Sequence, residues 1–284
     1  MTASGNKTTF IQKSKVLRRR GYSLNRIASE AGIPRSTIYW HVKNIALTPE
    51  QKDEIEKRRI ELCARHPNAR KGKCVAGRLV LKPEGWSEDL VHAFSHILFD
   101  GGIEKYGCAY YSSNISQIHH VEDLFKKVFG VTARIRKRNN GVFTLLASYI
   151  ELADYARRKE KVLLEHIIDG ASREEKRIFL QSFFDDEGSI YFNRGKRRVR
   201  GSQDSLPILR TVKKLLLEFG IGARIDESAK AIEVSGRQNI EMFKKEINFS
   251  GGVFINKDRK NSIWGRKIEK RQILSKAIGS YLHA

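Results

Sequence analysis

The sequence has few cysteines, no long apolar run and a shortage of acidic residues. No apolar stretch approaches the roughly 18 residues that a membrane-spanning helix needs, and no charged-then-apolar signal segment is present. We therefore predict a cytoplasmic protein, nucleoid-associated in a prokaryotic cell, with no membrane partner. The 284 residues suffice for two or three compact units with cores of their own.

The three cysteines do not suggest a disulfide framework, and reduced thiols are expected. Cys63, His66 and Cys74 offer three zinc ligands, but no fourth ligand follows at a convincing spacing, so zinc is the less favoured interpretation. His119 and His120 stand in the middle of an expected helix, where imidazoles are typical of the surface. The other histidines show no metal spacing either, so no histidine site is predicted.

Acidic residues are outnumbered 32 to 54 by basic ones, which gives a formal charge of +22. Both parts of the chain share the excess: residues 1–85 carry 19 basic and 7 acidic side chains, and the remainder carries 35 and 25. A hydrophobic content of 40% excludes a disordered basic tail. A folded protein this basic favours a polyanionic partner, with nucleic acid the first class to consider. A basic surface without such a partner is the alternative.

One stretch occurs twice, as Ser95-His-Ile-Leu-Phe-Asp100-Gly101-Gly-Ile103 and as Ser182-Phe-Phe-Asp-Asp-Glu187-Gly188-Ser-Ile190. In each copy a small residue precedes a carboxylate by five positions, and a glycine follows the carboxylate. Mostly apolar residues lead into both copies. Each copy therefore predicts a buried helix that ends in an acid and a glycine stop.

The residues downstream of each motif repeat as well. Phe129-Gly130-Val-Thr-Ala133-Arg134-Ile135 matches Phe219-Gly220-Ile-Gly-Ala223-Arg224-Ile225 at an offset of 90, and Val142 meets Ile232 at the same offset. The motifs are offset by 87, which predicts about three residues inserted before the second middle helix. Two copies of one helix–strand–strand–helix–strand–strand–helix unit follow, with a basic helix over 258–279 closing the chain. The expected helices cover about 87–100, 115–129, 148–165, 174–186, 205–219 and 237–246, and the expected strands about 102–107, 108–113, 131–138, 141–147, 189–194, 196–203, 221–227 and 230–235.

Basic side chains recur at every second position in strands of both units, so they share one face of each expected sheet. An antiparallel sheet with one apolar and one arginine-rich face suits a phosphate backbone and base edges. A merely solvated charged face is the alternative. The predicted DNA-binding residues of the two sheets are Arg134, Arg136, Arg138, Ser189, Tyr191, Asn193, Lys196, Arg198, Arg200 and Arg224.

The N-terminal region has the signals of short helices. A helix is expected from Phe10 to Arg20; Ser23 can then cap a helix that Gly32 ends, and Pro34 opens another. The pattern resembles the helix-turn-helix of resolvase and invertase recombinases, whose second helix enters the major groove. A unit used only for packing or protein contacts is the alternative. The resemblance implies DNA contacts from Arg35, Ser36, Thr37, Tyr39 and Trp40.

Two acid-and-glycine helices, each opening an αββαββα unit, resemble the monomeric LAGLIDADG homing endonucleases over about residues 86–280. The resemblance implies an α+β fold in which two pseudo-symmetric units form an antiparallel-sheet saddle, preceded by the all-α helix-turn-helix domain. The expected domains are 1–47 (helix-turn-helix), 48–85 (helical, basic linker), 86–170 (first unit) and 171–284 (second unit with a C-terminal helix).

The resemblance also implies roles for single residues. Ser95 and Ser182 would let the motif helices pack closely along the pseudo-twofold axis, and Asp100 and Glu187 would be the catalytic metal ligands at their ends. Phosphodiester hydrolysis needs an activated water and charge relief on phosphorus, and carboxylate-held divalent cations supply both. Mg²⁺, or another divalent cation, is the expected cofactor. Further catalytic candidates are Gln203, with Asn114 as its rough counterpart, and the basic residues Lys159 and Lys257.

The motifs depart from the family pattern in two places. A different register would put Gly101 at the acidic position of the first motif. We prefer Asp100 because both its spacing from the serine and the glycine after it match the second copy. In the second motif Asp185 and Asp186 are either auxiliary acids or charges at the helix end, and both interpretations stay open.

We predict a free-standing, monomeric, site-specific endonuclease that cuts double-stranded DNA at a long target site. An intein is not favoured, because Met1 precedes a helix-turn-helix and the chain ends at 281–284 without splice-junction residues. One alternative is a DNA-binding transcriptional regulator that has lost cleavage. WhiA-like regulators pair the same two folds, with the helix-turn-helix at the other end and eroded carboxylates. An RNA maturase is the other alternative. The acid kept in both motifs favours the enzyme.

Overall fold

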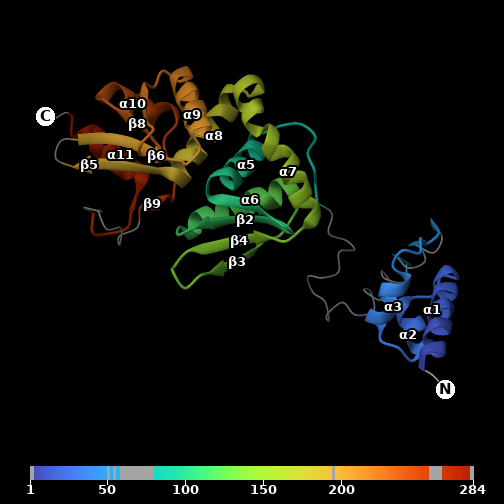
Figure 1. Ribbon diagram of the computed structural model, residues 1–284. Helices are drawn as coiled ribbons and strands as arrows, with labels where there is room; N and C mark the ends of the chain where they lie inside the picture. The colour runs from blue at the N-terminus through green and yellow to red at the C-terminus, as the bar shows by residue number, and fades with distance from the viewer. Residues whose placement is uncertain are drawn as a thin grey trace. The chain divides into compact units, whose positions relative to one another are not determined.

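The computed structural model describes residues 3–49, 52–53, 56–57, 80–193, 196–255 and 264–281. The chain divides into two compact units, 1–78 and 79–284 (Figure 1). Within the described residues, no helix is both long and apolar enough to span a bilayer.

Three helices of the N-terminal unit surround a small core. Ser23 caps the second helix by accepting a hydrogen bond from the Arg26 amide (3.2 Å), and Gly32 ends that helix in the left-handed region, as predicted. The helix expected after Thr48 is described at 52–53 and 56–57, and the rest of it lies outside the described residues. The three helices are α1 (Ala3–Arg19), α2 (Leu24–Ala31) and α3 (Arg35–Val42), and Ile27, Ile38 and Val42 are buried among them.

The second unit repeats one αββαββα arrangement, as the sequence predicts. The strand order is β1-β2-β4-β3 in one sheet and β5-β6-β8-β7 in the other, with antiparallel pairing throughout. The first copy comprises α5 (Glu88–Asp100), β1 (Gly101–Glu104), β2 (Gly107–Ser112), α6 (Ile115–Phe129), β3 (Arg134–Lys137), β4 (Phe143–Ala147) and α7 (Ile150–Glu165). After the π-helix η1 (His166–Gly170), the second copy comprises α8 (Arg173–Glu187), β5 (Gly188–Asn193), β6 (Lys196–Ser202), α9 (Leu206–Glu218), β7 (Ala223–Asp226), β8 (Ala231–Ser235) and α10 (Arg237–Glu246).

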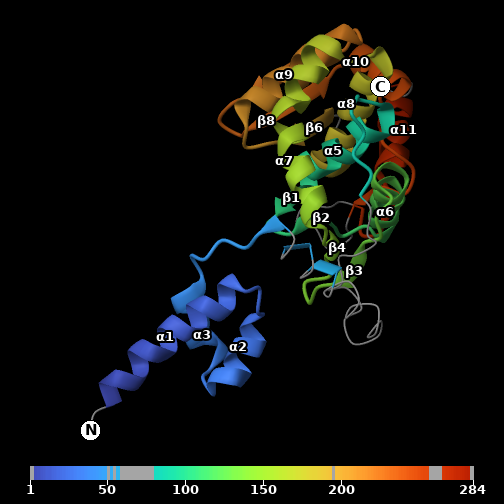
Figure 2. The same ribbon diagram turned by 90° about the vertical axis from the view of Figure 1, so that its right-hand side faces the viewer.

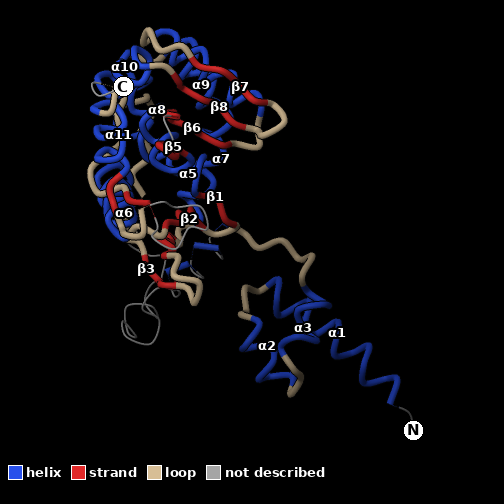
Figure 3. Tube along the Cα trace, turned by 90° about the vertical axis from the view of Figure 1, so that its left-hand side faces the viewer, coloured by secondary structure: helices blue, strands red, loops and turns tan. Residues whose placement is uncertain are grey.

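Helices cover one face of each sheet (Figures 2 and 3). Helices α5, α6 and α7 pack on the strands of the first sheet, and α8, α9 and α10 pack on those of the second. The apolar residues of both sheets and all these helices join one continuous core. The antiparallel sheets therefore keep one face for the core and turn the other toward solvent.

The C-terminal segment differs from the predicted helix over 258–279. Residues 256–263 lie outside the described part of the chain, and α11 covers Lys270–Gly279. Before it, β9 (Phe254–Ile255) pairs with β10 (Ile268–Glu269) in a two-stranded ladder. Burial of Ile268 (4% exposed) holds β10 against the unit, which delays the start of the helix.

The sequence offset between equivalent residues of the two copies changes at one more place than predicted, between β3 and β4. Ile135 pairs with Leu145, whereas its counterpart Ile225 pairs with Ile232. Leu145, not Val142, is therefore the structural counterpart of Ile232. The β3–β4 connection is longer by three residues, which compensates the insertion before the second middle helix and restores the offset of 87.

Helices α5 and α8 pack side by side at the centre of the unit (Figure 1). Ser95 and Ser182 are fully buried there. Each hydroxyl donates a hydrogen bond within its own helix, to the carbonyl oxygens of Val91 (2.7 Å) and Ile178 (3.0 Å). These small side chains leave no unpaired hydroxyl in the helix contact, which fits the packing role predicted for them.

The glycine after each acid is required by close approach rather than by a left-handed turn. Gly101 and Gly188 are extended, with φ of −119° and −87°. A Cβ at Gly101 would lie 2.6 Å from Ile97 Cα, and one at Gly188 would lie 2.2 Å from the Phe184 oxygen. A strand begins at each glycine and passes directly against the last helical turn. The preceding acid is consequently the last residue of its helix.

Candidate active site

The two predicted catalytic acids line one cleft. Asp100 ends α5, Glu187 ends α8, and both border a cleft of ≈ 680 Å³ between the two αββαββα copies. Asp100 therefore occupies the position equivalent to Glu187, as the preferred motif register predicts. The cleft is also lined by Ser112, Asn114, Gln117, Asp185, Asp186, Ser189, Ser202 and Lys270, among others.

The two acids are electrostatically coupled. Burial and the charge of Asp186 raise the pKa of Asp100, Lys270 and His96 oppose the rise, and the resulting pKa is about 7. Burial likewise raises the pKa of Glu187 to about 7, helped by the charges of Asp100 and Asp186. Like charges held close in a partly buried site disfavour full ionisation. A cation between them would remove that penalty.

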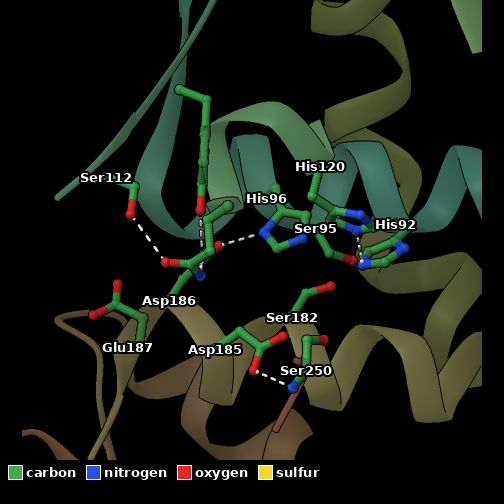
Figure 4. Close-up of polar contacts among 12 residues, drawn as sticks. His92, Ser95, His96, Ser112, His120, Ser182, Asp185, Asp186, Glu187 and Ser250 are labelled. Atoms are coloured by element: carbon green, nitrogen blue, oxygen red, sulfur yellow. Dashed lines mark hydrogen bonds and ion pairs between the residues drawn. The ribbon is translucent and has the colours of Figure 1, made fainter. Parts of the chain in front are cut away.

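Asp186 belongs to a buried hydrogen-bond network (Figure 4). Its carboxylate accepts from the Tyr110 hydroxyl (2.7 Å) and the Gln117 amide (3.3 Å), and it pairs with His96 Nδ1 (2.7 Å). The side chain is 0% exposed. Burial lowers the pKa of His96, but the Asp186 carboxylate outweighs that effect and the net direction is upward. Asp186 is thus an anchored partner within the site rather than a solvated charge at a helix end.

Asp185 and Lys270 meet at the floor of the same cleft. Asp185 is buried, which raises its pKa to about 6, and it accepts a hydrogen bond from the Ser250 amide (2.9 Å). The buried Lys270 ammonium donates to the carbonyl oxygens of Phe184 (3.2 Å) and Asp185 (2.6 Å). The closing helix thereby brings a cation to the last turn of α8.

The other catalytic candidates lie at different distances from the two acids. Gln203 donates from Nε2 to a carboxylate oxygen of Glu187 (3.3 Å), so it lies where predicted. Asn114 lines the cleft but donates to the carbonyl of Phe254 (3.1 Å) instead of an acid. Lys159 lies elsewhere, a correction to the prediction. Its ammonium donates to the Glu84 carbonyl (2.7 Å) and lies over the Trp86 ring. The packing of the Lys159 side chain against that ring holds the ammonium away from the cleft. Lys257 lies outside the described residues.

The basic face of the first sheet lines a groove. Arg134, Arg136 and Arg138 are exposed and border it together, which agrees with the predicted alternation. The Arg138 guanidinium donates to the Thr144 hydroxyl (2.8 Å) and lies 4.8 Å from the centre of the Tyr111 ring. These contacts fix one arginine while the other two extend into solvent.

The basic face of the second sheet is organised around one carboxylate. The largely buried Glu233 forms ion pairs with Arg198 (3.1 Å), Arg200 (3.8 Å) and Arg224 (3.6 Å). The equivalent position in the first sheet is the apolar Leu146. The two faces therefore have different charge patterns, which the repeat did not reveal. Across the β5–β6 pair, Ser189, Tyr191 and Asn193 lie opposite Arg200, Arg198 and Lys196.

Helix α3 of the N-terminal unit presents the five residues predicted to touch DNA. Tyr39 and Trp40 are 49% and 65% exposed, and the Lys43 ammonium lies 4.1 Å from the Trp40 ring centre. The exposed residues are Arg35, Ser36, Thr37, Tyr39 and Trp40.

No histidine site was predicted from the sequence, yet the ligand nitrogens of three histidines lie within 4.8 Å of one another. His92 and His96 stand one helical turn apart on α5, and His120 approaches them from α6 (Figure 4). Burial lowers the pKa of His92 to about 2, with help from its two neighbours. Burial also lowers the pKa of His120. His119 faces away, toward Glu122. The alternative set of Cys63, His66 and Cys74 lies outside the described residues.

Sequence reasoning missed several residues of the site for identifiable reasons. The i,i+4 spacing of His92 and His96 is a signal in the sequence itself. Lys270 carries no such signal, because it reaches the cleft through the packing of α11 on β5. Gln117 and Tyr110 likewise meet Asp186 only through tertiary structure.

Comparison with curated proteins finds two archaeal relatives. A probable translation initiation factor IF-2 of Thermococcus kodakarensis is 27% identical over 186 residues, which cover 61% of this chain and 15% of that protein. A protein of the same description from Pyrococcus furiosus is 33% identical over 72 residues, which cover 25% and 6% of the two chains. The chain thus spans a small part of the curated relatives it matches.

Two of the solved structures to which this chain is similar are a homing endonuclease and a WhiA domain. Mesophilic variants of the homing endonuclease I-DmoI share 16% identity, with a TM-score of 0.46 over 56% of this chain and 90% of that one. The N-terminal LAGLIDADG domain of DUF199/WhiA shares 18% identity, with a TM-score of 0.46 over 60% and 87%. Residues 174–248 match the family model of the LAGLIDADG-like domain. This chain therefore carries a LAGLIDADG-like domain, as its repeated motif predicted.

Proposed function

We propose that the chain is a divalent-metal-dependent endonuclease that hydrolyses phosphodiester bonds in both strands of a long DNA target. The observation that carries this proposal is the convergence of Asp100 and Glu187. Each acid ends the motif helix of one copy, both line one cleft, and the charge of Asp100 raises the pKa of Glu187. Two acids placed this way are costly for stability unless they serve a ligand.

The acids fit a hard divalent cation. Carboxylate oxygens, waters and phosphate oxygens are the ligands that Mg²⁺ prefers. Burial first, and then neighbouring carboxylates, raise the pKa values of Asp100 and Glu187, and a cation would relieve the repulsion among these carboxylates. When bound, the cation would polarise the scissile phosphate and acidify a water. Asp100 and Glu187 would hold it, whereas Asp186 already satisfies Tyr110 and His96.

The remaining residues position the acids and the DNA. Gln203 orients the Glu187 carboxylate by its amide hydrogen bond. The Lys270 ammonium places positive charge beside the cleft, where the phosphate gains negative charge during the reaction. The arginine faces of the two sheets would each bind one half of the target through its phosphates and base edges. One half-site for each copy accounts for cleavage of both strands.

We assign a second DNA contact to the N-terminal unit, residues 1–47. The exposed face of α3 would contact bases or phosphates that flank the main target, with Arg35, Tyr39 and Trp40 as its main groups. The linker at 48–85 would set the distance between the two contacts. Replacing Arg35 and Tyr39 by alanine should shorten the protected footprint at one end without shifting the cleavage position.

The test is cleavage of a plasmid library that carries randomised target sites, with and without Mg²⁺. The wild type should yield a population of linear plasmids enriched in one site class. Asp100→Asn and Glu187→Gln should each lower double-strand cutting at least about 100-fold, since each removes a metal ligand. Asp154→Asn, an exposed acid on α7, is the matched control and should cut normally.

Three results would overturn the proposal. Site-specific binding with no cutting by the wild type would leave a DNA-binding regulator as the better interpretation. Cutting that survives both substitutions would show that another site performs the hydrolysis. Preferred binding to a structured intron RNA over duplex DNA would favour a maturase instead.

A further inference from the structure

Three histidines form a cluster beside the carboxylate cleft and outside the proposed reaction. His92 and His96 lie on one face of α5, and His120 lies on α6. One ligand nitrogen from each lies within 4.8 Å of those of the other two. The ring centre of His92 lies 4.9 Å from that of His96 and 4.7 Å from that of His120. Three imidazoles converge on one point from two packed helices.

The central histidine is oriented by a carboxylate. His96 Nδ1 pairs with Asp186 at 2.7 Å, so its other ring nitrogen, Nε2, points toward the two remaining imidazoles (Figure 4). His96 is 1% exposed, and its Nε2 has no hydrogen-bond partner in the described structure. A buried polar atom without a partner is costly, and its presence points to an absent ligand. A histidine bonded to a carboxylate through one nitrogen is a common arrangement for metal binding through the other.

The spacing of the outer two histidines fits a tetrahedral ion. Nitrogens bound at about 2.0–2.1 Å to a tetrahedral Zn²⁺ lie about 3.3–3.4 Å apart. His92 Nε2 and His120 Nε2 are 3.3 Å apart. A direct hydrogen bond between two neutral imidazoles would give a similar distance, but it would leave His96 Nε2 without a partner. A shared ion satisfies all three nitrogens.

We propose that His92, His96 and His120 bind one borderline transition-metal ion, with Zn²⁺ as the reference species. Three neutral imidazole ligands favour zinc, cobalt, nickel or copper over Mg²⁺, which prefers oxygen. His120 lies at the surface, so the fourth coordination position faces solvent and takes a water. Any proton on a ligand nitrogen is released to solvent as the ion binds.

This site is separate from the proposed reaction but shares one residue with its surroundings. Asp186 bonds His96 on one side and borders the carboxylate cleft on the other. A bound ion would join α5 to α6 and hold His96 in the orientation that Asp186 accepts. The ion therefore serves to fix the geometry of the cleft wall, and its binding does not depend on whether the chain cuts DNA.

The test is a Co²⁺ and Zn²⁺ titration of the purified, chelator-treated full chain in buffer that contains excess Mg²⁺. The excess Mg²⁺ occupies the carboxylate cleft. The wild type should bind one equivalent of Co²⁺ and develop the visible absorption bands of a tetrahedral cobalt ion, which Zn²⁺ then displaces. His92→Gln and His120→Gln should each weaken binding at least about tenfold, and Asp186→Asn should weaken it about 10- to 100-fold.

Two controls separate this site from others. His119→Gln removes an adjacent histidine that faces Glu122 and should leave the affinity unchanged. Cys63→Ser combined with Cys74→Ser removes the other thiol-and-histidine set and should also leave it unchanged. His120→Gln alters a surface position, so circular dichroism should report a native fold for that variant.

The proposal is overturned by the absence of an equimolar Co²⁺ complex in the wild type, or by an unchanged affinity in both histidine variants. Loss of binding in the double-cysteine variant alone would show that the ion binds the set of Cys63, His66 and Cys74, which would also refute the proposal. Loss of binding in the histidine variants with normal DNA cleavage would support a metal site that is independent of the proposed endonuclease.

Discussion

At the scale of single residues, the burial of Asp100 costs stability at neutral pH. Its pKa is raised from 3.8 to about 7, so the folded chain holds this proton more tightly than the unfolded chain. The stability that the carboxyl contributes is fully present below about pH 4 and is lost as the pH rises through about 7. At neutral pH the ionised acid therefore opposes folding.

Asp100→Asn should stabilise the protein in the presence of a chelator, and more so at pH 8 than at pH 5. We expect the gain in free energy of unfolding to grow by about 1–3 kcal/mol between the two values, because the amide carries no charge to bury. Urea denaturation at both values measures it. Asp154→Asn, at an exposed position, tests whether loss of net charge alone has this effect. A gain that is equal at both pH values would contradict the argument.

The motif acids were predictable from sequence because local spacing determines them. A serine five positions upstream and a glycine downstream place Asp100 and Glu187 at equivalent helix ends. His120 and Lys270 were not predictable, since each reaches its partners from a helix remote in the sequence. Lys159 was misplaced for the same reason: it was expected after the third helix of its unit, whereas it lies within α7 and its neighbour Trp86 decides where the ammonium lies.

At the scale of elements, the junction between each motif helix and its strand is sterically tight. Gly101 and Gly102, adjacent in the first motif, provide a matched pair of positions at which to test this tightness. A methyl group at Gly101 would meet the backbone of Ile97 and Ala109 within 2.7 Å, while Gly102 has open space around it.

Gly101→Ala should therefore destabilise the protein by about 1–3 kcal/mol, as overpacking of a close backbone contact does, and Gly102→Ala should change stability little. Thermal unfolding of both variants provides the comparison. Equal effects at the two positions would show that backbone freedom, and not contact with the helix, selects glycine here.

The contact between α5 and α8 makes a second prediction about elements. Ser95→Leu should destabilise by about 1–3 kcal/mol because the helices cannot separate to admit the larger side chain. Ser275→Leu on α11 is the control, since that hydroxyl also bonds a carbonyl one turn earlier but the side chain is exposed. Denaturant midpoints distinguish them. Similar losses in both variants would indicate that the hydrogen bond, rather than the helix contact, matters.

Most elements were predictable because periodicity and repetition support each other. The bounds of α6, α8 and α10 agree with expectation within a residue or two. The β9–β10 ladder was not predictable, since strands of two residues have no measurable period. The shift at Leu145 was missed because an insertion and a longer turn cancel in the sequence offset.

At the scale of the whole molecule, the net charge of +22 predicts strongly salt-dependent DNA binding. The two sheets should contribute unequally. Arg134 pairs in register with Leu146 on the neighbouring strand β4, whereas Arg198, Arg200 and Arg224 share the Glu233 carboxylate.

Arg134→Gln should therefore lower the slope of log affinity against log salt concentration by about 0.9, the value for one lost phosphate contact. Glu233→Gln should have the opposite effect and steepen the slope, because three arginines lose their internal partner. Fluorescence anisotropy with a fixed duplex at several salt concentrations gives both slopes. Unchanged slopes in both variants would place the DNA elsewhere.

The position of Lys270 also has a consequence for the order in which the parts of the proposed site are synthesised. The ribosome completes both acidic helix ends, at residues 100 and 187, long before it adds the residue whose ammonium caps the last carbonyls of α8. A nascent chain would hold clustered acids without that compensating cation. The proposed site therefore gains this compensating cation only once residue 270 has been added to the chain.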